Sequence, residues 1–68
     1  MNISWKDIED IGIELFEAYP DENPLTIRFT DLLDKVLKIK NFTGTREESN
    51  EKKLEAIQMA WLEEYNEG

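Results

Sequence analysis

Residues 3–20 read ISWKDIEDIGIELFEAYP, and this stretch predicts an amphipathic helix from about Trp5 to Tyr19. Its apolar residues recur at three- and four-residue spacing, which places them along one side of a helix. They are Ile8, Ile11, Leu15 and Tyr19, with Trp5 and Gly12 alongside. Ser4 is a suitable N-cap, Asp7 follows three residues later as in a capping box, and the closing proline ends the helix.

The next segment predicts a short extended piece and then a second helix. Leu25 to Phe29 alternates weakly and contains residue types that favour strands, so we expect it to be extended. A helix from about Asp31 to Ile39 follows, with Thr30 or Asp31 as its cap. The apolar side of that helix is formed by Leu32, Leu33, Val36, Leu37 and Ile39.

A third helix is predicted from Thr45 to about Tyr65. Glu48 stands three residues after Thr45, which is the spacing of a second capping box. Its apolar face is formed by Leu54, Ile57, Trp61 and Tyr65. Asn50 lies one turn earlier on that same face, and a polar group there needs hydrogen-bond partners. We therefore expect Asn50 to tie this helix to the preceding loop.

Three helices with short extended pieces in 68 residues predict a compact, mostly α fold, with residues 1–68 forming a single domain. A winged-helix-like arrangement and a simple three-helix bundle both satisfy this order of elements. The helices should share one core, onto which Phe42 folds back from its loop. The expected core members are Trp5, Ile8, Ile11, Leu15, Tyr19, Leu32, Val36, Leu54, Ile57 and Trp61.

The composition excludes several classes of function. The chain has no cysteine and no histidine, which removes thiol catalysis, imidazole triads and zinc sites built on those ligands. No phosphate loop or enclosed pair of carboxylates is recognisable, so we expect no enzyme. The formal net charge of −8 opposes binding to nucleic acid. No membrane segment or signal peptide is recognisable, and we expect a soluble, cytoplasmic monomer without a membrane partner.

The most unusual charge pattern is a row of acids on the first helix. Seven acids and no base occur from Asp7 to Glu22. We define the acidic ridge as the residues of this row that are candidates for binding a partner. They are Asp7, Asp10, Glu14, Glu17, Asp21 and Glu22. Like charges at helical spacing are mildly destabilising, so the row suits docking on a basic surface, although a solvated helix face explains it equally simply.

The same carboxylates are candidate ligands for a hard cation. Those that could hold a metal are Asp10, Glu14, Glu17 and Asp21. Oxygen ligands suit iron, magnesium and calcium ions, but the glycine turn of an EF-hand is missing. We therefore expect no tightly bound cofactor, and at most weak Fe²⁺ or Fe³⁺ at exposed, water-rich positions.

The segment from Arg28 to Arg46 carries the opposite charge, a net +3. We call its five bases, Arg28, Lys35, Lys38, Lys40 and Arg46, the basic island. Its lysines are expected to balance acids of the same molecule. Arg28 lies between two apolar residues, and we expect it to pair with a nearby carboxylate. Met59 and Ala56 on the third helix would form a small contact patch if they are exposed.

Several strings of residues resemble one known family. AYPD at residues 18–21, RFTD at 28–31 and SNEK at 49–52 occur in this order, followed by LEAI at 54–57 and Trp61-Leu62. Together with Ile11-Gly12 and Leu15, they resemble the IscX family, also called YfhJ. The resemblance covers nearly the whole chain. Within these strings, Arg28, Asp31, Asn50 and Trp61 are the residues we expect to be structural.

The resemblance implies a modified winged-helix fold and a role in iron–sulfur cluster assembly. It also implies binding to the cysteine desulfurase of that system through the acidic surface, with weak binding of iron, and other assembly components are further candidate partners. Family members carry an acidic run in the loop after the second helix, whereas residues 38–45 here contain no acid. Docking is therefore expected to outweigh iron delivery.

Three functional hypotheses follow. The first is a non-enzymatic adaptor or regulator that docks on the desulfurase. The second is a frataxin-like iron donor, which the same carboxylates would serve. The third, a winged-helix DNA-binding regulator, rests on fold analogy alone. Acids outnumber bases along the third helix, so a DNA groove would repel it.

Overall fold

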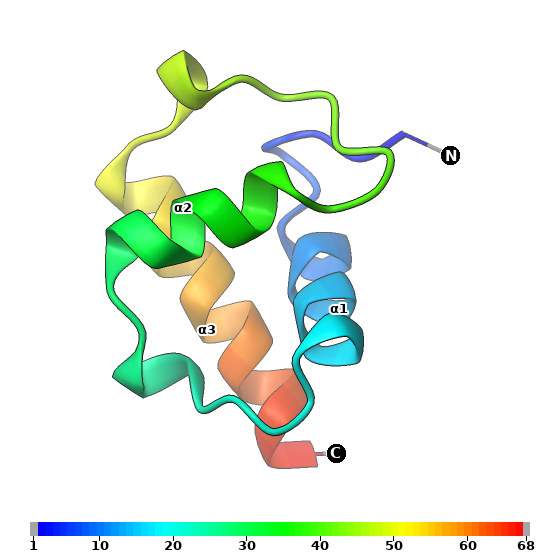
Figure 1. Ribbon diagram of the computed structural model, residues 1–68, viewed down its shortest axis with the longest axis vertical. Coiled ribbons are helices and arrows are strands. Elements are labelled where there is room, and N and C mark those ends of the chain that lie inside the picture. Colours follow the sequence, from blue (N-terminus) through cyan, green and yellow to red (C-terminus); the bar gives the residue numbers. More distant parts are fainter. Residues whose placement is uncertain (1, 68) are drawn as a thin grey trace.

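Three α-helices dominate the structure, a computed structural model that describes residues 2–67 (Figure 1). They are α1 (Ile8–Ala18), α2 (Phe29–Leu37) and α3 (Glu51–Glu67). In Figure 1, α1 and α3 run side by side in the same general direction, so that their C-terminal ends lie at the same end of the molecule, while α2 crosses in front of α3. The helical class of the fold is thus confirmed, and a radius of gyration of 10.6 Å is that of a compact chain of this length.

The core forms where the apolar sides of the three helices meet. Its buried side chains are Ile3, Trp5, Ile11, Leu15, Leu32, Val36, Leu54, Ile57 and Trp61. Ile8 and Tyr19 pack against it while remaining partly exposed. The expected core is therefore confirmed, and Ile3 is an addition. No helix within residues 2–67 combines the length and apolarity needed to cross a membrane.

The N-terminal segment is held against the loop after α2 instead of forming the first turn of α1. Ile3 makes an isolated parallel bridge with Phe42, and the indole N–H of Trp5 donates a 2.8 Å hydrogen bond to the carbonyl of Thr45. The rings of Trp5 and Phe42 meet edge to face at 5.1 Å, which confirms that Phe42 folds back onto the core. The predicted start of α1 at Trp5 was wrong, because this residue anchors a loop.

Ser4 and Asp7 form a turn before α1 and not the expected full capping box. Asp7 accepts hydrogen bonds from the Ser4 backbone N–H at 2.9 Å and from its hydroxyl at 3.2 Å. The Ser4 hydroxyl thus donates to the carboxylate, so the N-cap position falls on Asp7 and α1 begins at Ile8. The turn orients the chain into the helix without capping it through a side chain.

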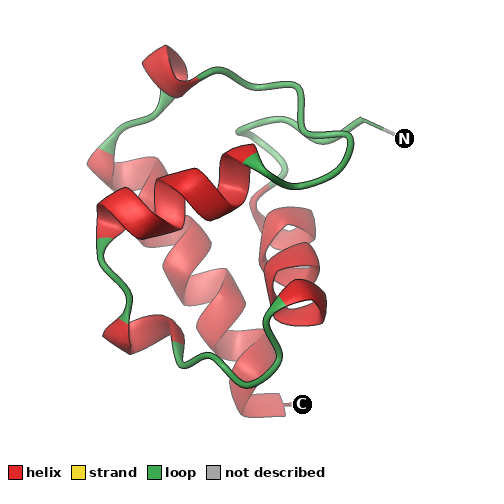
Figure 2. Ribbon diagram, viewed as in Figure 1, coloured by secondary structure: helices red, strands yellow, loops and turns green. Residues whose placement is uncertain are grey.

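The segment expected to be extended is largely a single-turn 3₁₀ helix, η1 (Pro24–Thr26), as Figure 2 shows. The Asn23 side chain accepts a hydrogen bond from the Leu25 N–H, and proline occupies the first position of the turn. Within the predicted segment, extended backbone angles are found at Ile27 and Arg28. No strand occurs within residues 2–67, so the winged-helix-like label is not confirmed.

The predicted start of the third helix at Thr45 was also wrong. The capping box of Thr45 and Glu48 forms, but it closes a separate 3₁₀ turn, η2 (Arg46–Glu48). The chain extends again at Ser49, and α3 begins after Asn50, whose side-chain oxygen accepts a 2.8 Å hydrogen bond from the Lys53 N–H. Asn50 is therefore the exposed N-cap of α3, not a polar residue on its core-facing side.

The pKa of Glu48 reports on the hydrogen bonds of its capping box. The Thr45 backbone N–H and hydroxyl donate to Glu48 at 2.8 and 3.1 Å, and these hydrogen bonds lower the pKa of Glu48 below its ordinary 4.5. The resulting stabilisation is present above the unfolded pKa and is lost as pH falls through the lowered folded value.

We expect Thr45→Val to raise the pKa of Glu48 part of the way back, because the stronger backbone bond remains. Carboxyl NMR titration of both proteins measures this, and identical Glu48 curves would contradict it.

Gly12 allows the close approach of α1 to α3. A Cβ at this position would lie 2.9 Å from the carbonyl carbon and the Cβ of Ala60, and 3.0 Å from the Trp61 nitrogen. These neighbours belong to a packed helix and cannot turn aside as a flexible side chain would. Helical glycines separated from other elements usually gain stability on becoming alanine.

We expect the opposite for Gly12→Ala, a loss of about 1–3 kcal/mol from overpacking, measured by urea denaturation. A variant more stable than the parent would show that the two helices separate at little cost.

Candidate protein-docking surface

The acidic ridge lies on the side of α1 away from the core and continues into the turn after it. Asp10, Glu17 and Asp21 are exposed, and Glu14 is partly exposed. Asp7, at one end of the ridge, is engaged with Ser4. The helix thus presents the middle of the ridge to solvent, as the helical spacing predicted.

Glu22, at the other end of the ridge, is paired within the molecule. Its carboxylate lies 3.4 Å from the ammonium of Lys35, which sits 4.0 Å from the centroid of the Tyr19 ring. The ring face attracts the cation, so both contacts hold Lys35 at the junction of α1 and α2. The prediction that a lysine of the basic island balances an internal acid is confirmed for Lys35. Glu22 is correspondingly less available to an outside partner than the central ridge.

A shallow groove of about 330 Å³ separates the ridge from the basic island. Glu14 and Glu17 line it from α1, and all three lysines of the basic island line it from α2 and the residues after it. The acidic and basic stretches are therefore neighbours across a groove and not opposite poles of the molecule. Within residues 2–67, neither Glu14 nor Glu17 approaches a lysine closely enough for an ion pair. Their carboxylates remain available for contacts with another molecule.

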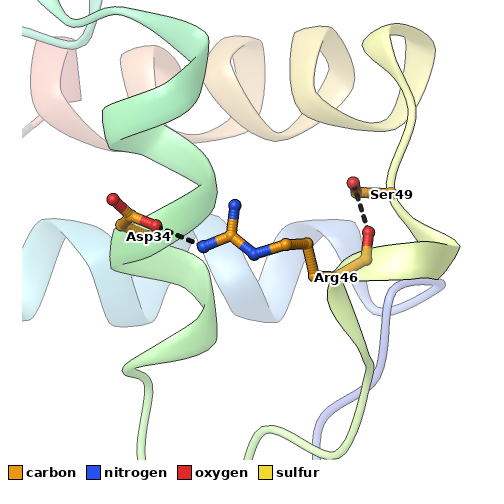
Figure 3. Close-up of polar contacts among 3 residues, drawn as sticks. All are labelled: Asp34, Arg46 and Ser49. Atoms are coloured by element: carbon orange, nitrogen blue, oxygen red, sulfur yellow. Dashed lines mark hydrogen bonds and ion pairs between the residues drawn. The ribbon is translucent and has the colours of Figure 1, made fainter.

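At the end of the basic island, Arg46 bonds to Asp34 of α2 at 2.7 Å, and its own carbonyl accepts a hydrogen bond from the Ser49 hydroxyl (Figure 3). Both charged groups are well exposed, so the ion pair contributes little to stability. It links η2 to α2 and leaves the ridge untouched.

Arg28 and Asp31, which were also expected to be structural, lie at the start of α2. Arg28 is its N-cap through backbone geometry, and its carbonyl accepts the Leu32 N–H at 2.8 Å. Its predicted pairing with a carboxylate is not found within residues 2–67. Asp31 lies in the first turn, where its negative charge interacts favourably with the positive end of the helix dipole. The predicted capping role of Thr30 or Asp31 was wrong, because α2 begins at Phe29 without a side-chain cap.

The four carboxylates considered as metal ligands do not gather at one point. In the described part of the chain, no three acidic side chains converge as they would around a metal ion. Asp10, Glu14 and Glu17 follow the outer side of α1, whereas Asp21 lies beyond its C-terminal end. A cation at this surface would be held by few carboxylates and mostly by water. The arrangement suits a broad contact with a basic surface better than it suits a built metal centre.

Comparison with known proteins identifies the family to which this surface belongs. The sequence profile of the family described as iron–sulphur cluster assembly matches residues 3–66, which include α1, α2, the entire ridge and all of α3 except Glu67. This chain belongs to the IscX family of iron–sulfur cluster assembly proteins. A curated relative from Pseudomonas aeruginosa, "Uncharacterized protein PA3808", is 41% identical over 64 residues, covering 94% of this chain and 97% of the relative.

Membership confirms the resemblance that was based on the strings AYPD, RFTD and SNEK. In this IscX-family chain each of those strings has its own structural role, which the sequence alone did not indicate. AYPD ends α1 and supplies Tyr19, on which Lys35 rests. RFTD begins α2, and SNEK contains the Asn50 cap of α3. The motifs therefore mark helix ends and junctions, whereas the central ridge lies within α1.

Proposed function

We propose that this protein is a non-enzymatic, cytoplasmic adaptor of iron–sulfur cluster assembly that docks on the cysteine desulfurase through the acidic ridge. Family membership supports the assembly system as the setting. The observation that carries the proposal is the exposed centre of the ridge, where Asp10, Glu14 and Glu17 form no ion pair within residues 2–67. Such a row costs helix stability, and a partner with basic groups would offset that cost.

The ridge would act in two stages. At a distance, its charge steers a basic partner toward the helix, which raises the rate of encounter. At contact, the carboxylates form short charge-assisted hydrogen bonds with arginine or lysine side chains. Because α1 is packed against α3 along its core side, the carboxylates are presented on a rigid support and little ordering is needed on binding.

A calorimetric titration of the purified desulfurase with this protein at two salt concentrations tests the proposal. Binding should weaken as salt rises, because exposed ion pairs are screened over a Debye length of about 8–10 Å at ~0.1–0.15 M. Absence of binding at low salt would refute the docking role.

Iron delivery is a second candidate, favoured only by the shared carboxylates. We expect Fe²⁺ or Fe³⁺ to bind weakly, since the ligands are exposed and few of them converge. The same desulfurase titration with and without Fe²⁺ separates the two roles, because an adaptor binds the enzyme without the metal.

DNA binding has no support from the arrangement of charge. On α3, five acids accompany Lys52 and Lys53. A helix of this kind is repelled by phosphate.

A further inference from the structure

A crease between α1 and α3 forms a second surface feature, distinct from the groove beside the basic island. Its volume is about 560 Å³. The lining residues are Glu9 of α1 and Ala56, Met59, Ala60, Leu62, Glu63 and Asn66 of α3. The crease follows from the close approach of the helices at Gly12, where small residues face each other. The small side chains of Ala56 and Ala60 leave space beside the larger Met59.

Met59 is the apolar wall of this crease, and its side chain is 55% exposed. It contributes little to the core, which is completed by Leu54, Ile57 and Trp61 on the other side of α3. Methionine is unbranched and flexible, so it adapts to the shape of an apolar partner. An exposed methionine beside small residues therefore has the properties of a contact site.

The charged groups at the crease are all acidic. Glu9 and Glu63 line it, and none of the bases that the structure describes does. A neighbouring hollow shares Ala56 and Met59, and adds Glu55 and Lys52. An apolar floor with an acidic rim is complementary to an apolar side chain that is flanked by lysine or arginine.

The crease also adjoins the acidic ridge. Ile13 lies one helical turn after Glu9 on α1 and is 40% exposed. At 100° per residue, it falls between Glu9, which lines the crease, and Glu17 of the ridge. The surface from Met59 to Glu17 thus has apolar residues bordered by carboxylates.

We infer that the crease is the apolar anchor site of the docking surface, and that it receives an apolar side chain flanked by basic residues on the protein partner. This inference rests on the proposed docking function and adds the site that supplies short-range affinity. Interfaces of this kind concentrate their binding energy in a small desolvated centre, while the charged rim sets orientation and rate. Glu9 and Glu63 form the charged rim beside the crease, Met59 lies between them, and the ridge adds further carboxylates along α1.

Met59→Gln tests the anchor site, because glutamine has a similar size and helix propensity but a polar end. The matched control is Leu25→Gln, since Leu25 is 61% exposed on η1 and does not line the crease. Titrations of the desulfurase with each variant, at low and high salt, give the affinities, and circular dichroism verifies the fold. We expect Met59→Gln to weaken binding about tenfold, by a similar factor at both salt concentrations, while Leu25→Gln binds like the parent.

Ala56→Gln provides a second variant, because it fills the floor of the crease from an exposed helical position. It should produce a comparable loss. If both crease variants bind like the parent while changes in the ridge abolish binding, the anchor site is refuted and the docking function stands. If the parent protein does not bind the desulfurase, the docking function is refuted and the anchor site fails with it.

Discussion

Replacing Trp61 with alanine is expected to lower the free energy of unfolding by about 3–5 kcal/mol. The indole is fully buried and packs at a tilt against Tyr19, with the ring centroids 6.4 Å apart. Its removal leaves a large cavity at the centre of a domain whose total stability is about 5–15 kcal/mol at most. Urea denaturation followed by circular dichroism measures the change, and we expect much of Trp61→Ala to be unfolded at 37 °C.

Trp61→Phe is the matched control for this substitution. The indole N–H of Trp61 has no hydrogen-bond partner within residues 2–67, so its loss breaks no bond. Phenylalanine also refills most of the cavity, and the cost should be well below that of alanine. An alanine variant that unfolds at the same urea concentration as the parent would show that Trp61 is not central to the core.

The core could be predicted from the sequence because its residues recur at helical spacing over long stretches. Ile11 and Leu15 on α1 and Leu54 and Ile57 on α3 are all buried as expected. A helix with one apolar side has few ways to bury it, so burial follows once the period is recognised. Ile3 escaped prediction because it precedes any repeating pattern, and its burial depends on a bridge to a residue far along the chain.

The ends of the elements could not be predicted as well, because competing local signals lay close together. Thr45 with Glu48 and Asn50 with Lys53 both form capping hydrogen bonds, and the second pair follows the first by five residues. The first closes a 3₁₀ turn and the second begins α3, a division that spacing alone does not reveal. Similarly, the residue types around Ile27 favoured a strand, but the turn beginning at Asn23 and Pro24 prevailed.

The position of the ridge on α1 was predictable, whereas its surroundings were not. Helical geometry alone aligns Asp10, Glu14 and Glu17. The pairing of Glu22 with Lys35 depends on where α2 lies relative to α1, and periodicity contains no information about the placement of one helix against another. For the same reason, the sequence indicated only that Met59 would form a contact patch if it were exposed. The crease depends on the packing of α1 against α3, which the sequence did not show.

Reversing the charge of the central ridge is expected to abolish docking. The variant combines Asp10→Lys, Glu14→Lys and Glu17→Lys, which lie away from the core, so the fold should persist. Three attractions become three repulsions, and we expect affinity for the desulfurase to fall on the order of a hundredfold or more at ~0.1 M salt.

A control with the same change in charge separates a specific surface from general electrostatics. Glu47→Lys, Glu51→Lys and Glu67→Lys are exposed and lie outside both the ridge and the crease. Each reversal adds two charges, so both triple variants raise the formal net charge from −8 to −2. If binding depended only on net charge, both variants would lose affinity equally. If the ridge is a defined docking surface, only the ridge variant would lose affinity.

The most direct test of the account is therefore a calorimetric titration of the cysteine desulfurase with the parent protein, the ridge variant and the charge-matched control. Circular dichroism should first establish that all three are folded. We expect the parent and the control to bind with similar affinity, and the ridge variant to show no measurable binding. A folded ridge variant that binds at full strength would contradict this expectation.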